Sequence, residues 1–206
     1  FNYAKLSYEL KYDRDAIDAL QKIPANSKYQ DDAQALMAQV LINTRDYDKA
    51  LSMLDGIPNR SPKLNSAYQQ LAYLRGIQLY QNNQHDEARR YFNRSLDYPI
   101  DKRINTLASY WMGAIANEQK EYPISKNHMN AFLSQAKNYK DLPEESSLYM
   151  GQYIQGYNLL KLKDYTGAQA QFKSSIDGIN QNKASIKSEQ IKNGVRGDAV
   201  LRAGDC

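Results

Sequence analysis

The sequence has little of what disulfide-linked, metal-binding and membrane-spanning proteins need. Its one cysteine, Cys206, is the last of 206 residues, so the chain has no internal disulfide. No apolar run approaches the roughly 20 residues that a bilayer-spanning helix requires, and no transmembrane segment is expected. The two histidines, His85 and His128, have no second ligand at a spacing that binds metal. The sequence therefore predicts neither a metal site nor a cofactor.

Residues that favour β-strands are also scarce. The chain has only three Val and three Thr, beside abundant Ala, Leu, Gln and Lys. This balance favours helices and predicts an all-α fold. The 17 tyrosines supply most of the aromatic content. Tyrosine suits thin layers in which one end of a side chain is buried and the other is wet.

Charge and side-chain chemistry exclude further classes. The net charge is +4, from 27 basic and 23 acidic side chains that are interspersed along the chain. A mild basic cluster near residues 183–196 is diluted by Glu189 and Asp198, so binding of nucleic acid is not expected. No nucleophile, base and oxyanion donor stand in a recognisable catalytic pattern. The sequence therefore predicts a protein that is not an enzyme.

What the sequence does contain is a repeat. Small residues recur within similar phrases at spacings of 34, 38, 37 and 43, and they are Ala16, Ala50, Ala88, Ser125 and Ala168. Twelve residues before each stands a second small residue, in the order Ala4, Ala38, Gly76, Gly113 and Gly156. Glycine inside helical sequence costs about 1 kcal/mol relative to alanine. Its recurrence here predicts that another helix passes too close to leave room for a Cβ.

These features resemble the tetratricopeptide repeat family over residues 1–180 or so. Tyr47, Tyr122 and Tyr165 occupy the family's aromatic position at the turn, and His85 occupies it in the third unit. The resemblance implies a right-handed superhelix, an α-solenoid of about five helical hairpins plus a C-terminal helix. The expected repeats are 1–26, 27–60, 61–99, 100–140 and 141–181, with a C-terminal helix or the start of a further repeat at 182–206.

The expected helix pairs follow from the same pattern. They are 1–11 and 14–23, 29–44 and 47–56, 63–82 and 85–97, 102–119 and 122–137, and 143–162 and 165–181, before a last helix at 185–203. Glu144 and Glu145, after Pro143, are expected in the first turn of a helix. No Gly/Ser-rich linker divides the chain, which predicts one array over 1–206. Both ends are expected to be cut from a longer array, with neighbouring repeats beyond them.

Tyrosines supply the candidate binding site. In this family the first helix of each pair lines a concave groove, and Tyr73, Tyr110 and Tyr153 stand three residues before the small position there. Tyr80 and Tyr157 lie one turn beyond and beside that position. A row of tyrosines can bind an extended peptide through ring contacts and hydroxyl hydrogen bonds. The alternative is that these rings pack between successive first helices.

The resemblance implies a non-enzymatic scaffold that binds a protein or peptide in the groove. Phrases such as LINTRDYDKAL resemble long bacterial tetratricopeptide proteins of the cell envelope, which implies a periplasmic location. A second hypothesis is a peptide-responsive regulatory domain that controls an output domain elsewhere in the full-length protein. The third, an enzyme, requires a catalytic domain outside this segment.

Overall fold

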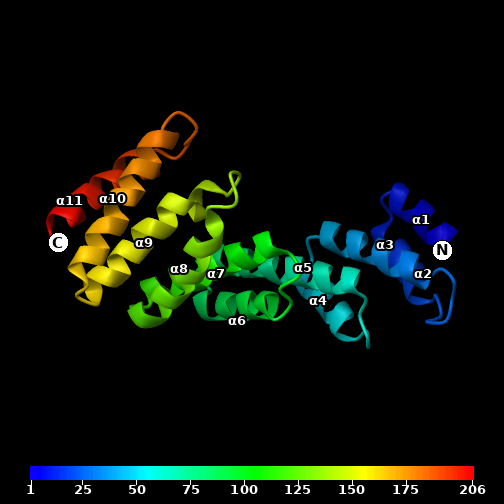
Figure 1. Ribbon diagram of the computed structural model, residues 1–206. Coiled ribbons are helices and arrows are strands. Elements are labelled where there is room, and N and C mark those ends of the chain that lie inside the picture. The colour runs from blue at the N-terminus through cyan, green and yellow to red at the C-terminus, as the bar shows by residue number, and fades with distance from the viewer. The chain divides into compact units, whose positions relative to one another are not determined.

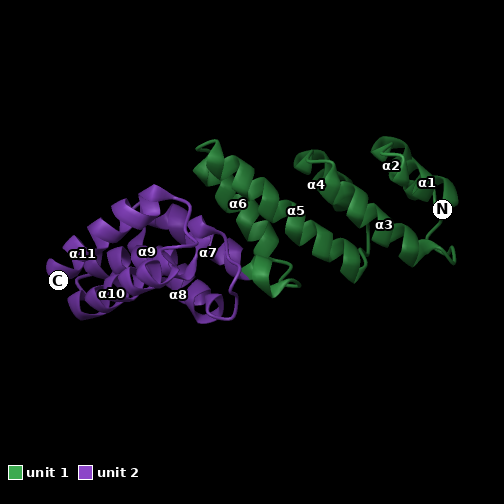
Figure 2. Cartoon of the chain, turned by 90° about the horizontal axis from the view of Figure 1, so that it is seen from above, with its two compact units in different colours: residues 1–105 green, residues 106–206 purple.

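A computed structural model describes all residues from 1 to 206 and contains helices but no strand. The chain forms two compact units, residues 1–105 and residues 106–206 (Figure 2). None of the helices is both long and apolar enough to span a membrane. The fold class is therefore the expected one, an all-α solenoid built from helical hairpins (Figure 1).

The first unit consists of three successive hairpins. They are α1 (Asn2–Glu9) with α2 (Asp13–Gln21), α3 (Gln30–Asn43) with α4 (Tyr47–Asp55), and α5 (Pro62–Gln81) with α6 (His85–Leu96). Local sequence explains where two of these helices, α4 and α5, begin. The Asp46 carboxylate accepts the backbone N–H of Lys49 at 3.3 Å, and the Ser61 hydroxyl accepts that of Leu64 at 3.3 Å. Such caps satisfy backbone donors that have no partner within the helix.

The second unit contains the later hairpins and a closing helix. The elements are α7 (Lys102–Glu118), which begins in the first unit, α8 (Tyr122–Ala136), a 3-10 turn (Glu144–Ser146), α9 (Leu148–Lys161), α10 (Tyr165–Asn182), a π-helical turn (Gln190–Val195) and α11 (Arg196–Gly204). The boundary between the units lies inside α7, so no linker separates them. Whether the array is one continuous superhelix stays a prediction.

Two expected helix starts are wrong. The helix expected from residue 143 begins at Leu148, because the Ser147 hydroxyl accepts the Met150 N–H at 3.4 Å and caps it there. Glu144 and Glu145 do lie in the first turn of a helix after Pro143, but that helix is the short 3-10 turn Glu144–Ser146 and not α9. The Glu144 carboxylate accepts the backbone N–H groups of Lys187 at 2.7 Å and Ser188 at 3.1 Å. The last helical segment, expected from 185, begins at Gln190.

The glycines in the first helices mark close contacts, as expected. A Cβ added at Gly76 would lie 2.6 Å from the ring of Phe92, and one at Gly156 would lie 2.6 Å from the ring of Phe172. At Gly113 the nearest atom would be the terminal methyl of Met129, at 2.8 Å. The partner is in each case 16 residues further along the chain. These three hairpins are therefore closed by a large side chain that packs on a glycine.

Candidate functional site

The predicted tyrosines of α5 remain partly accessible. Tyr73 and Tyr80 are both half-buried. The ring of Tyr73 lies 6.0 Å from that of Phe92, and the ring of Tyr80 stacks on His85 at 5.1 Å with an interplanar angle of 15°. Each ring is thus held by the second helix of its own hairpin while part of it faces solvent. Tyr73 and Tyr80 therefore stay candidates for a contact surface.

Tyr110 requires a correction. It was expected to present its hydroxyl to a groove, but only 2% of its surface is exposed. Its ring packs edge-on against Phe132 at 5.1 Å and against Trp111 at 5.2 Å. Aromatic pairs in this geometry stabilise a core. Tyr110 is therefore part of the packing of the second unit and offers a ligand almost no surface.

Tyr153 and Tyr157 are brought together, but they face another helix of the chain. The Tyr153 hydroxyl donates to Asp198 Oδ2 at 2.8 Å, and the Tyr157 hydroxyl donates to the same oxygen. Arg202, one turn further along α11, donates from Nε to the Tyr157 hydroxyl at 3.0 Å. Burial and the nearby Asp198 carboxylate raise the pKa of both tyrosines. In this arrangement α11 covers the two tyrosines, and sequence spacing gave no signal for it.

Charged residues on the second helices form contacts that the sequence did not predict. Asp48 of α4 accepts the Tyr91 hydroxyl at 2.9 Å and forms an ion pair with Arg75 at 2.6 Å. Arg94 of α6 forms an ion pair with Asp55 at 2.7 Å and donates to the Tyr68 hydroxyl. Asp48 and Tyr91 are 43 residues apart in the chain. These contacts join successive hairpins, and no local sequence motif predicts them.

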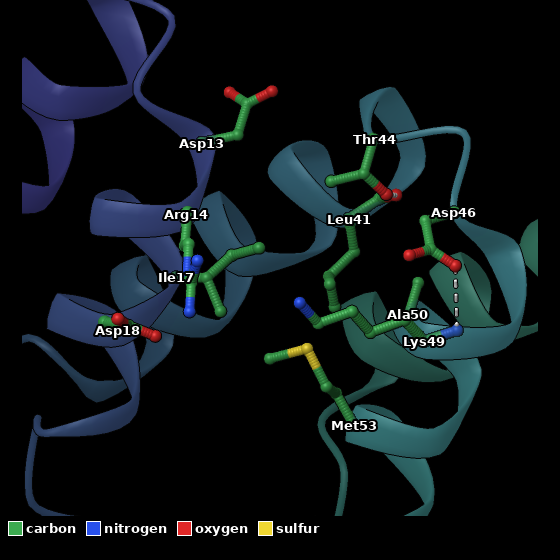
Figure 3. Close-up of a pocket in the computed structure, with 10 residues that line it drawn as sticks. All are labelled: Asp13, Arg14, Ile17, Asp18, Leu41, Thr44, Asp46, Lys49, Ala50 and Met53. Carbon is green, nitrogen blue, oxygen red and sulfur yellow. Dashed lines mark hydrogen bonds between the residues drawn. The ribbon is translucent and has the colours of Figure 1, made fainter.

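A cleft of about 370 Å³ separates α2 from α4 (Figure 3). Apolar side chains form part of its lining, and they are Ile17, Leu41, Ala50 and Met53. Lys49 extends from α4 across the cleft toward α2, while Arg14 and Asp18 stand on the opposite wall (Figure 3). One oxygen of Asp13, at the edge of the cleft, is buried without a hydrogen-bond partner. The lining of this cleft therefore combines apolar side chains with charges of both signs.

None of these places has the composition of a metal centre. No group of three or more His, Cys, Asp or Glu side chains converges anywhere in the chain. The repeated helical hairpins and the contacts between them instead define a helical repeat protein.

Comparison with known proteins identifies the kind of repeat. Residues 12–72 match the model of the family described as Tetratricopeptide repeat. The chain is also 29% identical over 122 residues to the DnaJ homolog subfamily C member 7 homolog of Dictyostelium discoideum, over 58% of this chain and 22% of that protein. No solved structure shows a significant similarity. With the hairpin architecture, these matches support a tetratricopeptide repeat fold, and proteins of that family are typically non-enzymatic scaffolds for protein interactions.

Proposed function

We propose that the chain binds a protein or peptide segment along the face formed by its first helices, as a non-enzymatic scaffold in a bacterial cell-envelope assembly. The proposal assigns no catalytic step to this segment and no nucleic-acid ligand. It includes neighbouring repeats in the same polypeptide and a periplasmic location. Fractionation of cells that express the full-length protein tests the location, and recovery in the cytosol would contradict it.

The observation that carries the proposal is an ordered aromatic and aliphatic stripe on α5. Tyr73, Ile77 and Tyr80 are spaced by four and three residues, so they share one face of the helix. All three are partly exposed, and the two rings are held by Phe92 and His85. Rings that are already ordered lose little conformational entropy when a partner binds. This stripe therefore has the apolar area and the order that a peptide contact needs.

The set of proposed contact residues is accordingly smaller than the one that the sequence suggests. Tyr73 and Tyr80 remain in the proposed site with Ile77. Tyr110 is excluded by its burial, and Tyr153 and Tyr157 are occupied by Asp198.

Site-specific photocrosslinking tests the proposal. A benzophenone amino acid at Ile77 is expected to crosslink to a discrete partner in cells of the source organism. The matched control places it at Asn93, an exposed residue of α6. Once the partner is identified, Tyr73→Phe with Tyr80→Phe should weaken binding several-fold, because each lost hydroxyl contact is worth about 1 kcal/mol. Equal crosslinking at Ile77 and Asn93 would contradict the proposed face.

A regulatory role is the second candidate, and α11 favours it. Asp198 presents a carboxylate to two tyrosines of α9, and an acidic group of a signalling peptide could replace that carboxylate. The helix would then be released when the peptide binds, and an output domain elsewhere in the polypeptide would respond. An increase in amide hydrogen exchange in α11 when the peptide is added would support this role. A full-length sequence without an output domain would argue against it.

A further inference from the structure

The turns that join the two helices of each hairpin share an unusual backbone conformation. One residue in each turn has a positive φ, and its value is 65° at Lys11, 57° at Arg45, 59° at Asn83, 64° at Lys120 and 64° at Lys163. Each stands seven residues after the small position of its first helix. The left-handed region is favourable for glycine and tolerable for asparagine, but it is costly for other side chains. Four of the five turns nevertheless carry a cation there.

The strain is imposed by the way the helices end. In the first hairpin the Tyr12 N–H donates to the Ser7 carbonyl at 2.8 Å, and the Lys11 N–H donates to the Tyr8 carbonyl at 3.0 Å. This pair of bonds closes a helix C-terminus around one left-handed residue. Glycine would satisfy the same bonds at lower cost. Backbone geometry therefore explains the conformation at Lys11, but it does not explain why the side chain is cationic.

In the first unit two of these cations line the same cleft. Lys11 and Arg45 stand around a space of about 440 Å³ whose other lining residues are Tyr8, Asp13, Ile42, Asn43 and Tyr47. The amide of Asn43 donates to the Tyr8 hydroxyl at 2.9 Å, and this bond holds the ends of α1 and α3 side by side. The Tyr8 hydroxyl accepts in that bond, so its own proton remains available to a ligand.

Neither cation forms an ion pair within the chain. Lys11 lies over the ring of Tyr8, 5.7 Å from its centroid, and Arg45 is exposed. The one carboxylate in the lining is Asp13, which leaves an excess of one positive charge. Two cations that are held at fixed backbone positions, with a hydroxyl and an amide between them, complement a negatively charged group.

We propose that this turn cleft, formed by Tyr8, Lys11, Asp13, Ile42, Asn43, Arg45 and Tyr47, binds acidic side chains of an extended protein segment. The inference rests on the proposed scaffold function and places a second contact at the hairpin turns. Helices pack about 8–10 Å apart, which equals about three residues of extended chain. Carboxylates three residues apart can therefore meet Lys11 and Arg45 in turn.

The same lining disfavours nucleic acid. Double-stranded DNA carries a charge about every 1.7 Å along its axis, and so dense a row of phosphates would lie against Asp13. Asp46 directly follows Arg45 and adds a second repulsive charge at the turn. A protein segment can space its acidic residues to avoid both carboxylates. The cleft accordingly fits separated carboxylates better than a phosphate backbone.

The test uses the 206-residue chain and a fluorescein-labelled decaglutamate peptide, followed by fluorescence anisotropy. Binding is expected at an ionic strength of about 0.02 M and should weaken at about 0.15 M, because salt screens exposed charges. A decaglutamine peptide should not bind. If the wild-type chain fails to bind decaglutamate at low salt, the inference is wrong.

Paired variants locate the binding. Lys11→Asn with Arg45→Asn removes both charges and places at each turn the residue that the third hairpin already has, so the fold should be kept. This variant is expected to bind decaglutamate about three- to tenfold more weakly, as the loss of two exposed ion pairs implies. The control, Lys22→Gln with Lys63→Gln, makes the same charge change at exposed residues of the first unit outside the cleft. It should change binding less than about twofold.

Other outcomes overturn the inference in distinct ways. Equal weakening by the control pair would show a response to net charge alone. Equally tight binding of a labelled decathymidine would indicate a general polyanion site. The charge-preserving pair Lys11→Arg with Arg45→Lys should retain binding. If a partner still crosslinks at Ile77 while decaglutamate does not bind, the turn cleft is refuted and the scaffold function stands.

Discussion

Replacing Gly76 with alanine tests how α5 and α6 are held together. The added Cβ would lie 2.6 Å from Cε1 and 2.7 Å from Cδ1 of Phe92, whereas carbon atoms in favourable contact are about 3.5–4.0 Å apart. Phe92 is fully buried, so its ring has no open space to enter. The two helices must separate, or the ring must leave its preferred rotamer.

The magnitude follows from two opposing effects. Overpacking of a core costs about 1–3 kcal/mol, and the short contact places Gly76→Ala in the upper part of that range. Alanine returns about 1 kcal/mol because its helix propensity exceeds that of glycine. The free energy of unfolding should therefore fall by about 1–2 kcal/mol in urea denaturation followed by far-ultraviolet circular dichroism. The control is Gly197→Ala in α11, where an added Cβ meets no atom within 4 Å and stability should rise.

A second substitution makes the test specific to this contact. The second hairpin has Ala38 and Leu54 at the spacing that Gly76 and Phe92 have in the third. Phe92→Leu should therefore destabilise the wild-type chain but relieve the strain of Gly76→Ala, with a coupling energy of at least about 1 kcal/mol. The reasoning is refuted if the two effects simply add, or if Gly76→Ala is as stable as Gly197→Ala.

Three further changes probe contacts that hold the ends and the connections. The pKa of Glu144 is lowered from 4.5, chiefly by two backbone N–H groups near the start of the last helical segment. The ionised Glu144 carboxylate therefore stabilises the fold fully above pH 4.5, and this stabilisation is lost as the pH falls through the lowered pKa. Glu144→Gln should therefore reduce the loss of stability below pH 4.5 in urea titrations at several pH values. Asp198→Asn weakens the acceptor for Tyr153 and should cost about 1–3 kcal/mol, with faster hydrogen exchange in α11. Gln69→Leu removes the bonds to both backbone groups of Asp101, made at 2.7 and 3.0 Å, and should cost about 1–3 kcal/mol in thermal unfolding.

The hairpins could be predicted because their signals are local. The recurring small residues determine where two helices approach, and Gly76 and Gly156 lie against the rings of Phe92 and Phe172, as that spacing requires. Turn and cap residues such as Asp46 determine where helices begin. The start of α9 was less predictable, because Ser147 caps the helix there and Glu144 instead binds backbone groups more than 40 residues away. Acidic residues after a proline form the same local sequence pattern whether they begin a long helix or bind a distant part of the backbone.

The candidate site was less predictable, because one helix face can serve two purposes. Residues on the first helix of a hairpin can face a ligand, or they can face the first helix of the next hairpin. Either role places the residues at the same intervals in the sequence. The position of Tyr8 in the sequence does not show which of the two it faces, but in the structure its hydroxyl accepts a hydrogen bond from the Asn43 amide on α3. Likewise, the Asn117 amide on α7 donates to the Asn158 side chain on α9 at 2.8 Å. Tyr8 and Asn117 stand four residues after the small position of their helices, as Tyr80 does. Contacts between successive first helices therefore recur at this register.

The exposure of a side chain decides whether it can contact a ligand or only packs against another helix. That exposure depends on which helix follows in the chain. Tyr153 and Tyr157 are satisfied by α11, which supplies a carboxylate that no spacing rule predicts. On α5 the rings of Tyr73 and Tyr80 are held from the side by Phe92 and His85, so their order does not depend on a ligand. A ring that is ordered and still partly exposed can gain contact area on binding at little entropic cost. For that reason the half-buried stripe of α5, rather than the full row of tyrosines, is where a partner should be sought.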